Sequence, residues 1–165
     1  MATIALDAMG GDFGPEVVIP AAVHVVKKIK DVHIILVGDE SRLRDVIKEL
    51  NISLGDHFEI EHASQVVEMH EDPRHAVRKK KDSSIRVAFN LIKSNEASAV
   101  VSTGNSGATM AAGMFVLKRI PGIDRPAIAT LVPNLKDQTL ILDVGGNVDC
   151  KAPHLVQFAL MGSVY

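Results

Sequence analysis

The chain has little of what several common functions need. Cys150 is the one cysteine among 165 residues, so no intramolecular disulfide can form and a reducing compartment is expected. Tryptophan is absent and aromatic residues make up 4% of the chain, which argues against base stacking as a mode of action. The net charge of −2 gives no sign of a nucleic-acid partner either.

Long apolar runs are also missing. No stretch approaches the roughly 20 residues needed to cross a bilayer, and the N-terminus lacks the basic and apolar regions of a signal peptide. We therefore expect a cytoplasmic protein. The hydrophobic content of 47% and the charged content of 23% are typical of a globular protein with a packed core.

Segments with strand character alternate with segments of helical periodicity. Strands are predicted at 3–6, 33–37, 58–62, 97–101, 127–132 and 139–144, and helices at 16–30, 41–50, 84–93, 106–118 and 152–165. This alternation predicts a three-layer α/β/α sandwich with a mostly parallel sheet. Only residues 133–138 separate the last two strands, too few for a parallel crossover, so a hairpin and a mixed sheet are expected. We expect a single α/β domain over 1–165, whose last helix has no stop signal, as in the N-terminal part of a longer chain.

Two loops that follow predicted strands combine glycines with carboxylates. Ligands of parallel sheets bind beyond the carboxyl ends of strands, so these loops are candidate site organisers. Read locally, each is equally well explained as an ordinary turn. The candidate site-organising residues are Asp7, Gly10, Gly11, Asp12, Asp143 and Gly145.

A third loop joins the strand at 97–101 to an apolar helix and is rich in small hydroxyl and glycine residues. Backbone N–H groups at a helix N-terminus favour an anion, and this interpretation is slightly preferred over a simple helix cap by Asn105 or Ser106, with which it can coexist. The candidate anion-binding residues of this loop are Ser102, Thr103, Gly104, Ser106 and Gly107.

A basic segment precedes the helix predicted at 84–93. It is either a solvated face or a surface for an anionic ligand or an acidic protein. Its candidate residues are Arg74, Arg78, Lys79, Lys80 and Lys81, followed by Ser83 and Ser84. The seven histidines form no i, i+4 pair, and cysteines do not cluster, so we expect no metal site.

Five stretches, in this order, resemble the bacterial phosphate acyltransferase family of phospholipid synthesis. They are 4–12 (IALDAMGGD), 35–39 (ILVGD), 78–84 (RKKKDSS), 101–108 (VSTGNSGA) and 143–150 (DVGGNVDC). Gly146 and Thr103 stand where the family often has alanine. Members of the family also continue well past Tyr165, so this chain resembles the N-terminal part.

The resemblance implies transfer of an acyl group from acyl carrier protein to inorganic phosphate, without a cofactor. It implies a fold similar to the isocitrate and isopropylmalate dehydrogenases, a homodimer, and peripheral contact with the inner face of the membrane through the C-terminal part. For this reaction we expect phosphate at the loop 102–107, helped by Ser83 or Ser84, and catalytic roles for Asn105, Asn147, Lys80 and Lys81. Arg74, Arg78 and Lys79 are expected to contact the carrier protein.

Two alternatives use the same residues. One is a phosphate acetyltransferase-like enzyme that acts on coenzyme A thioesters, and the other is a non-catalytic truncated domain that binds phosphate or a partner. A dehydrogenase is disfavoured because no dinucleotide fingerprint is present.

Overall fold

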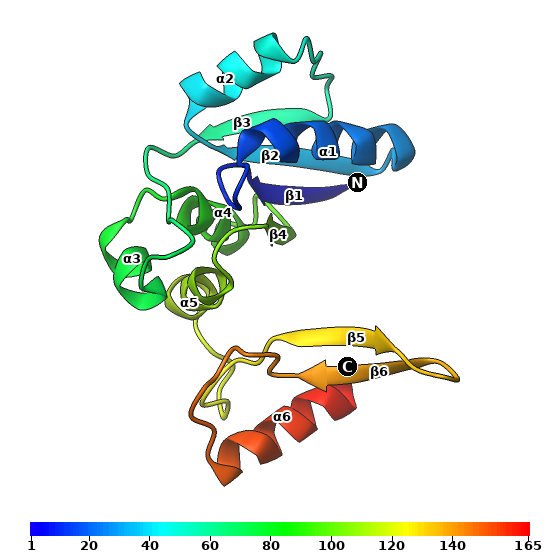
Figure 1. Cartoon of the computed structure of the whole chain (residues 1–165), viewed down its shortest axis with the longest axis vertical. Helices are drawn as coiled ribbons and strands as arrows, with labels where there is room; N and C mark the ends of the chain where they lie inside the picture. Colours follow the sequence, from blue (N-terminus) through cyan, green and yellow to red (C-terminus); the bar gives the residue numbers. More distant parts are fainter. The chain divides into compact units, whose positions relative to one another are not determined.

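The computed structural model describes residues 1–165 as two compact units, Met1–Leu117 and Lys118–Tyr165 (Figure 1). The first unit is built on a parallel sheet of β1 (Ala2–Asp7), β2 (Val32–Gly38), β3 (Phe58–His62) and β4 (Ala99–Ser102), in the order β3-β2-β1-β4. Its helices are α1 (Pro15–Lys28), α2 (Glu40–Glu49), α3 (Pro73–Lys79), α4 (Ser84–Lys93) and α5 (Ser106–Val116).

Helices cover both faces of this sheet because its strands are apolar on both sides. Successive side chains of a strand point to opposite faces. Thus Leu6 and Leu36 pack with α1 and α2 in one cluster, whereas Ala5 and Val37 pack with α4 in another. On the second face, α5 packs beside α3 and α4 and meets Val100 of β4. The predicted three-layer sandwich is confirmed.

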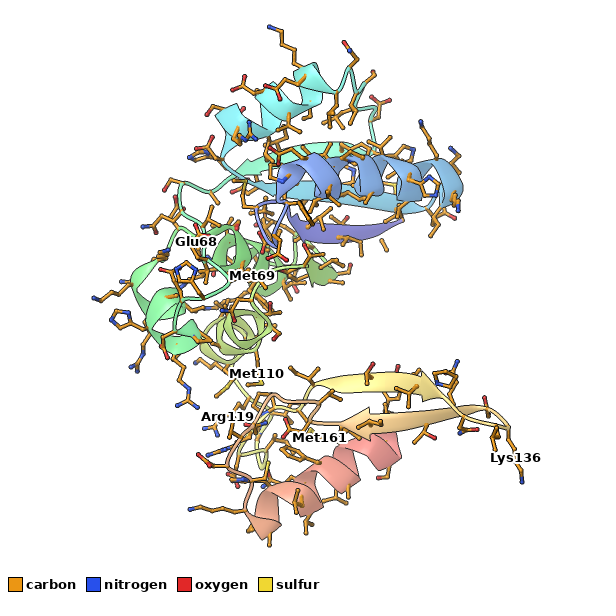
Figure 2. All side chains as sticks on the ribbon, viewed as in Figure 1. Glu68, Met69, Met110, Arg119, Lys136 and Met161 are labelled. Carbon is orange, nitrogen blue, oxygen red and sulfur yellow. The ribbon has the colours of Figure 1, made fainter.

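The second unit holds an antiparallel hairpin and one helix. β5 (Ala129–Pro133) pairs with β6 (Gln138–Leu142), and α6 (Ala152–Val164) packs on the hairpin, with Gly162 against the Leu142 side chain. Asn134 closes the turn, because its Oδ1 accepts hydrogen bonds from the N–H groups of residues 136 and 137. Lys136 lies at the tip of this hairpin (Figure 2).

The hairpin is confirmed, but the mixed sheet is not formed as predicted. Parallel and antiparallel pairing occur in two separate sheets, one of four strands and one of two. That residues 1–165 form a single domain stays a prediction. None of the helices has both the length and the hydropathy needed to span a bilayer.

Candidate functional site

The loops that follow β1 and β4 meet at the carboxyl edge of the sheet. The two strands are parallel neighbours, with Asp7 opposite Ser102, so the loops that follow them leave the sheet at the same point. Ser102 Oγ donates to Asp7 Oδ2 at 2.7 Å, and Thr103 Oγ1 donates to the Gly10 carbonyl at 3.1 Å. Two segments predicted separately from the sequence therefore form one cluster.

Glycine at position 10 permits this approach. A Cβ atom there would lie 2.8 Å from the Gly104 backbone nitrogen and 2.8 Å from Asp7 Oδ2, closer than real Cβ contacts. Gly11 has a φ of +85°, a backbone conformation that residues other than glycine rarely adopt. The Gly10-Gly11 pair is thus required by backbone packing, whatever ligand the loop binds.

Asp7 is a buried carboxylate held by the chain itself. The residue is only 3% exposed. Its carboxylate accepts a hydrogen bond from Ser102 Oγ and another, at 3.3 Å, from the Met9 N–H. Ser102 Oγ in turn accepts from the Gly104 N–H at 3.1 Å. These contacts suit the predicted organising role of Asp7, which stays a prediction.

Asn105 fixes both the start of α5 and the loop before α3. Its Oδ1 accepts from the Ala108 N–H at 3.0 Å, and its Nδ2 donates to the carbonyls of Met69 and Glu71 at 3.0 and 3.2 Å. Met69 and its neighbour Glu68 lie in that loop (Figure 2). Both amide hydrogens are therefore used, so a role for Asn105 as oxyanion donor, which stays a prediction, requires this loop to move.

The first turn of α5 supplies other donors. The first N–H groups of a helix have no acceptor within it, and no side-chain oxygen accepts a hydrogen bond from the N–H groups of Ser106 and Gly107. The Ser106 side chain is exposed. A cavity behind this loop, lined by Asp7, Ser102 and Asn105, measures about 10 Å³, room for about one water. An anion must therefore approach the exposed side of the loop.

Lys80 is engaged in the protein rather than free. Its Nζ donates to the Val66 carbonyl and to Glu71 Oε2, each at 2.6 Å. The hydrogen bond from Lys80, with a second from the Glu68 N–H, holds the pKa of Glu71 below its usual value. Lys80 thus ties the loop before α3 to the end of that helix, and its predicted catalytic role stays untested.

The two serines at the start of α4 are buried. Ser83 is fully buried and its Oγ donates to the Lys80 carbonyl at 2.9 Å, while Ser84 is 2% exposed. An anion arriving from solvent does not meet these hydroxyl groups in this conformation. Their contact with phosphate stays a prediction that needs a rearranged loop. Lys81, by contrast, is exposed and makes no ion pair.

The basic segment forms a helix that the sequence analysis missed. Asp72 caps α3 by accepting from the His75 N–H at 2.7 Å, and Pro73 occupies the first turn. Both are standard start signals and could have revealed the helix. The predicted carrier-contact residues Arg74, Arg78 and Lys79 are exposed on it, with Arg78 5.2 Å from the ring centre of Phe115.

The remaining candidates lie in the second unit. Asn147 Nδ2 donates to Asp143 Oδ1 at 2.8 Å and to the Pro126 carbonyl at 2.9 Å. Asp143 and Gly145 have positive φ values of 64° and 77°. Desolvation, together with Asp143 accepting from its S–H group, raises the pKa of the Cys150 thiol. That Asn147 and Asn105 share one active site stays a prediction.

The sequence analysis also missed an apolar groove of about 530 Å³ in the first unit. It begins at the glycine loops, where Gly10, Gly11, Asp12 and Thr103 line it, and continues along α1. Val17, Ala21 and Val25 form its helical wall, at i, i+4 and i+8. This second apolar stripe on α1, beside the buried one, was the available signal.

Comparison with known proteins gives consistent matches. The family model described as "Fatty acid synthesis protein" matches residues 2–165. The phosphate acyltransferases of Methylococcus capsulatus and Geobacter sulfurreducens are 56% and 60% identical to the chain over 162 residues, which is 98% of it. Those residues make up 48% and 46% of the two relatives, so the chain spans about half the length of the curated relatives it matches.

A solved structure shares the fold. The EutD phosphotransacetylase from Staphylococcus aureus superposes with a TM-score of 0.64 at 19% identity, over 96% of this chain and 50% of that one. This likeness concerns the fold alone. The similarity to isocitrate and isopropylmalate dehydrogenases implied by the sequence resemblance stays a prediction.

Proposed function

The chain belongs to the fatty acid synthesis protein family, and from this premise we propose that it is the N-terminal part of an acyl-carrier-protein:phosphate acyltransferase. The observation that carries the proposal is the identity of 56–60% to proteins named phosphate acyltransferase over 98% of the chain. The joined glycine loops at the carboxyl edge of the sheet support it, because parallel sheets bind their ligands there.

The proposed reaction needs phosphate held beside a thioester carbonyl. A phosphate oxygen attacks the carbonyl carbon, a C–O bond forms, and the C–S bond breaks as the carrier thiolate leaves and takes up a proton. The attack needs positioning of two reactants and donors for the tetrahedral oxyanion. The free N–H groups of Ser106 and Gly107, at the positive end of α5, are the donors best placed to bind phosphate. Exposed Lys81 adds charge.

We propose that the exposed face of α3 contacts the acyl carrier protein. Arg74 and Arg78 are one turn apart, as are His75 and Lys79, so the basic side chains repeat along this short helix. An acidic protein partner would be attracted to such a surface, and its binding would weaken as salt screens the charges.

The test of the reaction is acyl phosphate formation by a full-length protein that contains this chain, made by joining it to the remainder of the Geobacter sulfurreducens relative. Turnover with acyl carrier protein and phosphate supports the proposal. Turnover with coenzyme A thioesters alone would favour the phosphotransacetylase-like alternative, which the shared fold with EutD makes worth testing. No turnover with either carrier, in a folded protein, would leave the non-catalytic alternative.

The phosphate loop and the carrier surface have separate tests in that protein. Ser102→Ala combined with Asn105→Ala should raise the KM for phosphate, since both residues shape the start of α5; unchanged phosphate kinetics would remove this loop from the mechanism.

Lys79→Glu should weaken carrier binding at low salt, whereas Lys28→Glu on α1 should not. Equal effects of the two reversals would argue against an α3 contact.

The homodimer and the peripheral contact with the inner face of the membrane remain proposals. Sedimentation of the full-length protein and its flotation with anionic vesicles would measure each directly.

A further inference from the structure

Residues 66–71, between β3 and α3, form a loop with little support of its own. The segment contains no helix or strand, and residues 68–70 are exposed to solvent. Val67 is its one buried residue, at 7% exposure. Two exposed members of this loop, Glu68 and Met69, are labelled in Figure 2. The position of the loop therefore depends on Val67 and on hydrogen bonds to the rest of the first unit.

Those hydrogen bonds all run in one direction. Lys80 Nζ and Asn105 Nδ2 are the donors, and oxygen atoms of loop 66–71 are the acceptors. The N–H groups of the loop that donate do so only within it, between Glu68 and Glu71. The acceptors are the carbonyls of Val66, Met69 and Glu71 and the carboxylate of Glu71, at 2.6–3.2 Å. Two side chains thus hold the loop, and both are predicted from the sequence to be catalytic.

The loop also lies against the groups that would hold an anion. A Cβ atom at Gly107 would be 2.7 Å from Pro73 Cγ, so the chain that leaves the loop packs on the first turn of α5. Val67 lines the cavity of about 10 Å³ together with Asp7 and Ser102, so the loop forms part of the wall of that cavity. An ammonium group and an amide N–H group are donors suited to an oxyanion, and here a carboxylate and carbonyl oxygens take them.

We propose that loop 66–71 is a gate over the anion site at the start of α5. In the closed form its oxygen atoms occupy the donors of Lys80 and Asn105, and a phosphate anion opens the gate by taking both donors. Glu71 then acts as a latch, because its carboxylate is the charged group that holds Lys80 in the closed form. The inference rests on the proposed function only in naming phosphate as the anion.

A gate of this kind competes with its ligand. The apparent affinity for phosphate is the affinity of the open form reduced by the fraction of molecules that are open. Glu71→Gln removes the charge that holds Lys80 but keeps the backbone contact of residue 71 with Asn105, so it should raise the open fraction and lower the KM for phosphate. Lys80→Met breaks the same ion pair but also deletes a phosphate donor, so it should raise that KM.

Phosphate kinetics of the full-length hybrid, in which this chain is joined to the remainder of the Geobacter sulfurreducens relative, compare the two variants. We expect Glu71→Gln to lower the KM for phosphate at least about threefold and Lys80→Met to raise it at least about threefold. Glu68→Gln is the matched control and should leave the KM unchanged, because Glu68 is exposed in the same loop and makes no ion pair. A purely structural contact would shift the KM in the same direction in both variants. That result, or an unchanged KM in Glu71→Gln, would overturn the proposal.

Hydrogen exchange measured by mass spectrometry tests the gate without turnover. The exchange of residues 66–71 in the hybrid is compared in inorganic phosphate and in sodium chloride of equal ionic strength. We expect phosphate to speed this exchange at least about threefold, because the N–H groups lose protection when the loop opens. Glu71→Gln should have the same effect without phosphate.

The outcomes separate the gate from the proposed reaction. Equal exchange in the two salts would overturn the gate, even if the hybrid forms acyl phosphate. Faster exchange in phosphate without acyl phosphate formation would support the gate and reject the reaction. If the hybrid does not fold, the same comparison is made on the 165-residue chain, which contains every group of the gate.

Discussion

Ser102→Ala is the substitution that most directly tests how the two loops are joined. Ser102 Oγ donates to Asp7 Oδ2 at 2.7 Å and accepts from the Gly104 N–H at 3.1 Å. Alanine would remove the hydrogen-bond donor to the carboxylate of Asp7, a residue only 3% exposed. It would also remove the acceptor of the Gly104 N–H. Hydrogen bonds to buried charged groups contribute about 1.5–3 kcal/mol, so we expect unfolding of the first unit to become easier by about 2–3 kcal/mol.

Urea unfolding followed by circular dichroism measures this loss. For a slope of about 2 kcal/mol per M, the midpoint should fall by about 1–1.5 M. Ser41→Ala is the matched control, because Ser41 Oγ also donates to an aspartate, Asp39 Oδ1, at 2.6 Å, but on the surface. That variant should leave the midpoint close to that of the unmodified chain. If the two alanine variants unfold alike, the burial of Asp7 does not strengthen its bond to Ser102, and the reasoning fails.

Three further predictions concern other contacts. Asn105→Ala should destabilise α5 by about 1–2 kcal/mol through loss of its cap, and should speed amide exchange in residues 69–72; Asn105→Asp keeps the cap acceptor and should affect mainly the exchange. Since the pKa of Glu71 lies below its usual 4.5, its bond to Lys80 stabilises the fold above that pH and is lost as pH falls through the lowered value. The free energy of unfolding, measured by urea titration at several pH values, should therefore fall less steeply between pH 4.5 and that lowered pKa in Lys80→Met than in the unmodified chain. Because the pKa of Cys150 is raised, iodoacetamide should alkylate it slowly at neutral pH, and Asp143→Asn should increase the rate; an unchanged rate would contradict the role of that carboxylate.

The regular elements were largely predictable because their signals are local. The strand at 58–62 and the helix at 84–93 have the predicted bounds, since alternation and helical spacing of apolar residues are visible within each segment. The helix α3 was missed because its 7 residues are too few to show a clear apolar periodicity, although Asp72 and Pro73 are start signals.

The contacts of the candidate site were less predictable because their partners are distant in sequence. Two roles of Asn105, helix cap and site residue, are compatible with its sequence neighbours. The structure shows the cap, because Asn105 Oδ1 accepts from the Ala108 N–H. The acceptors of its Nδ2 group, the carbonyls of Met69 and Glu71, lie 36 and 34 residues away and could not be predicted locally. Likewise, the burial of Ser83 depends on packing with α3 and with the loop before it, which no local pattern reveals.

The pairing of β1 with β4 has a consequence for the order in which the chain folds. β1 reaches β2 through one crossover, but Asp7 and Ser102 are 95 residues apart, so their bond closes a much longer loop. Contacts of high sequence separation form slowly, because the chain loses loop entropy before they stabilise it. During synthesis, β1 to β3 can pair while β4 is still inside the ribosome, which leaves one edge of β1 open. Formation of the glycine-loop cluster would then mark the end of folding of the first unit, rather than its nucleus.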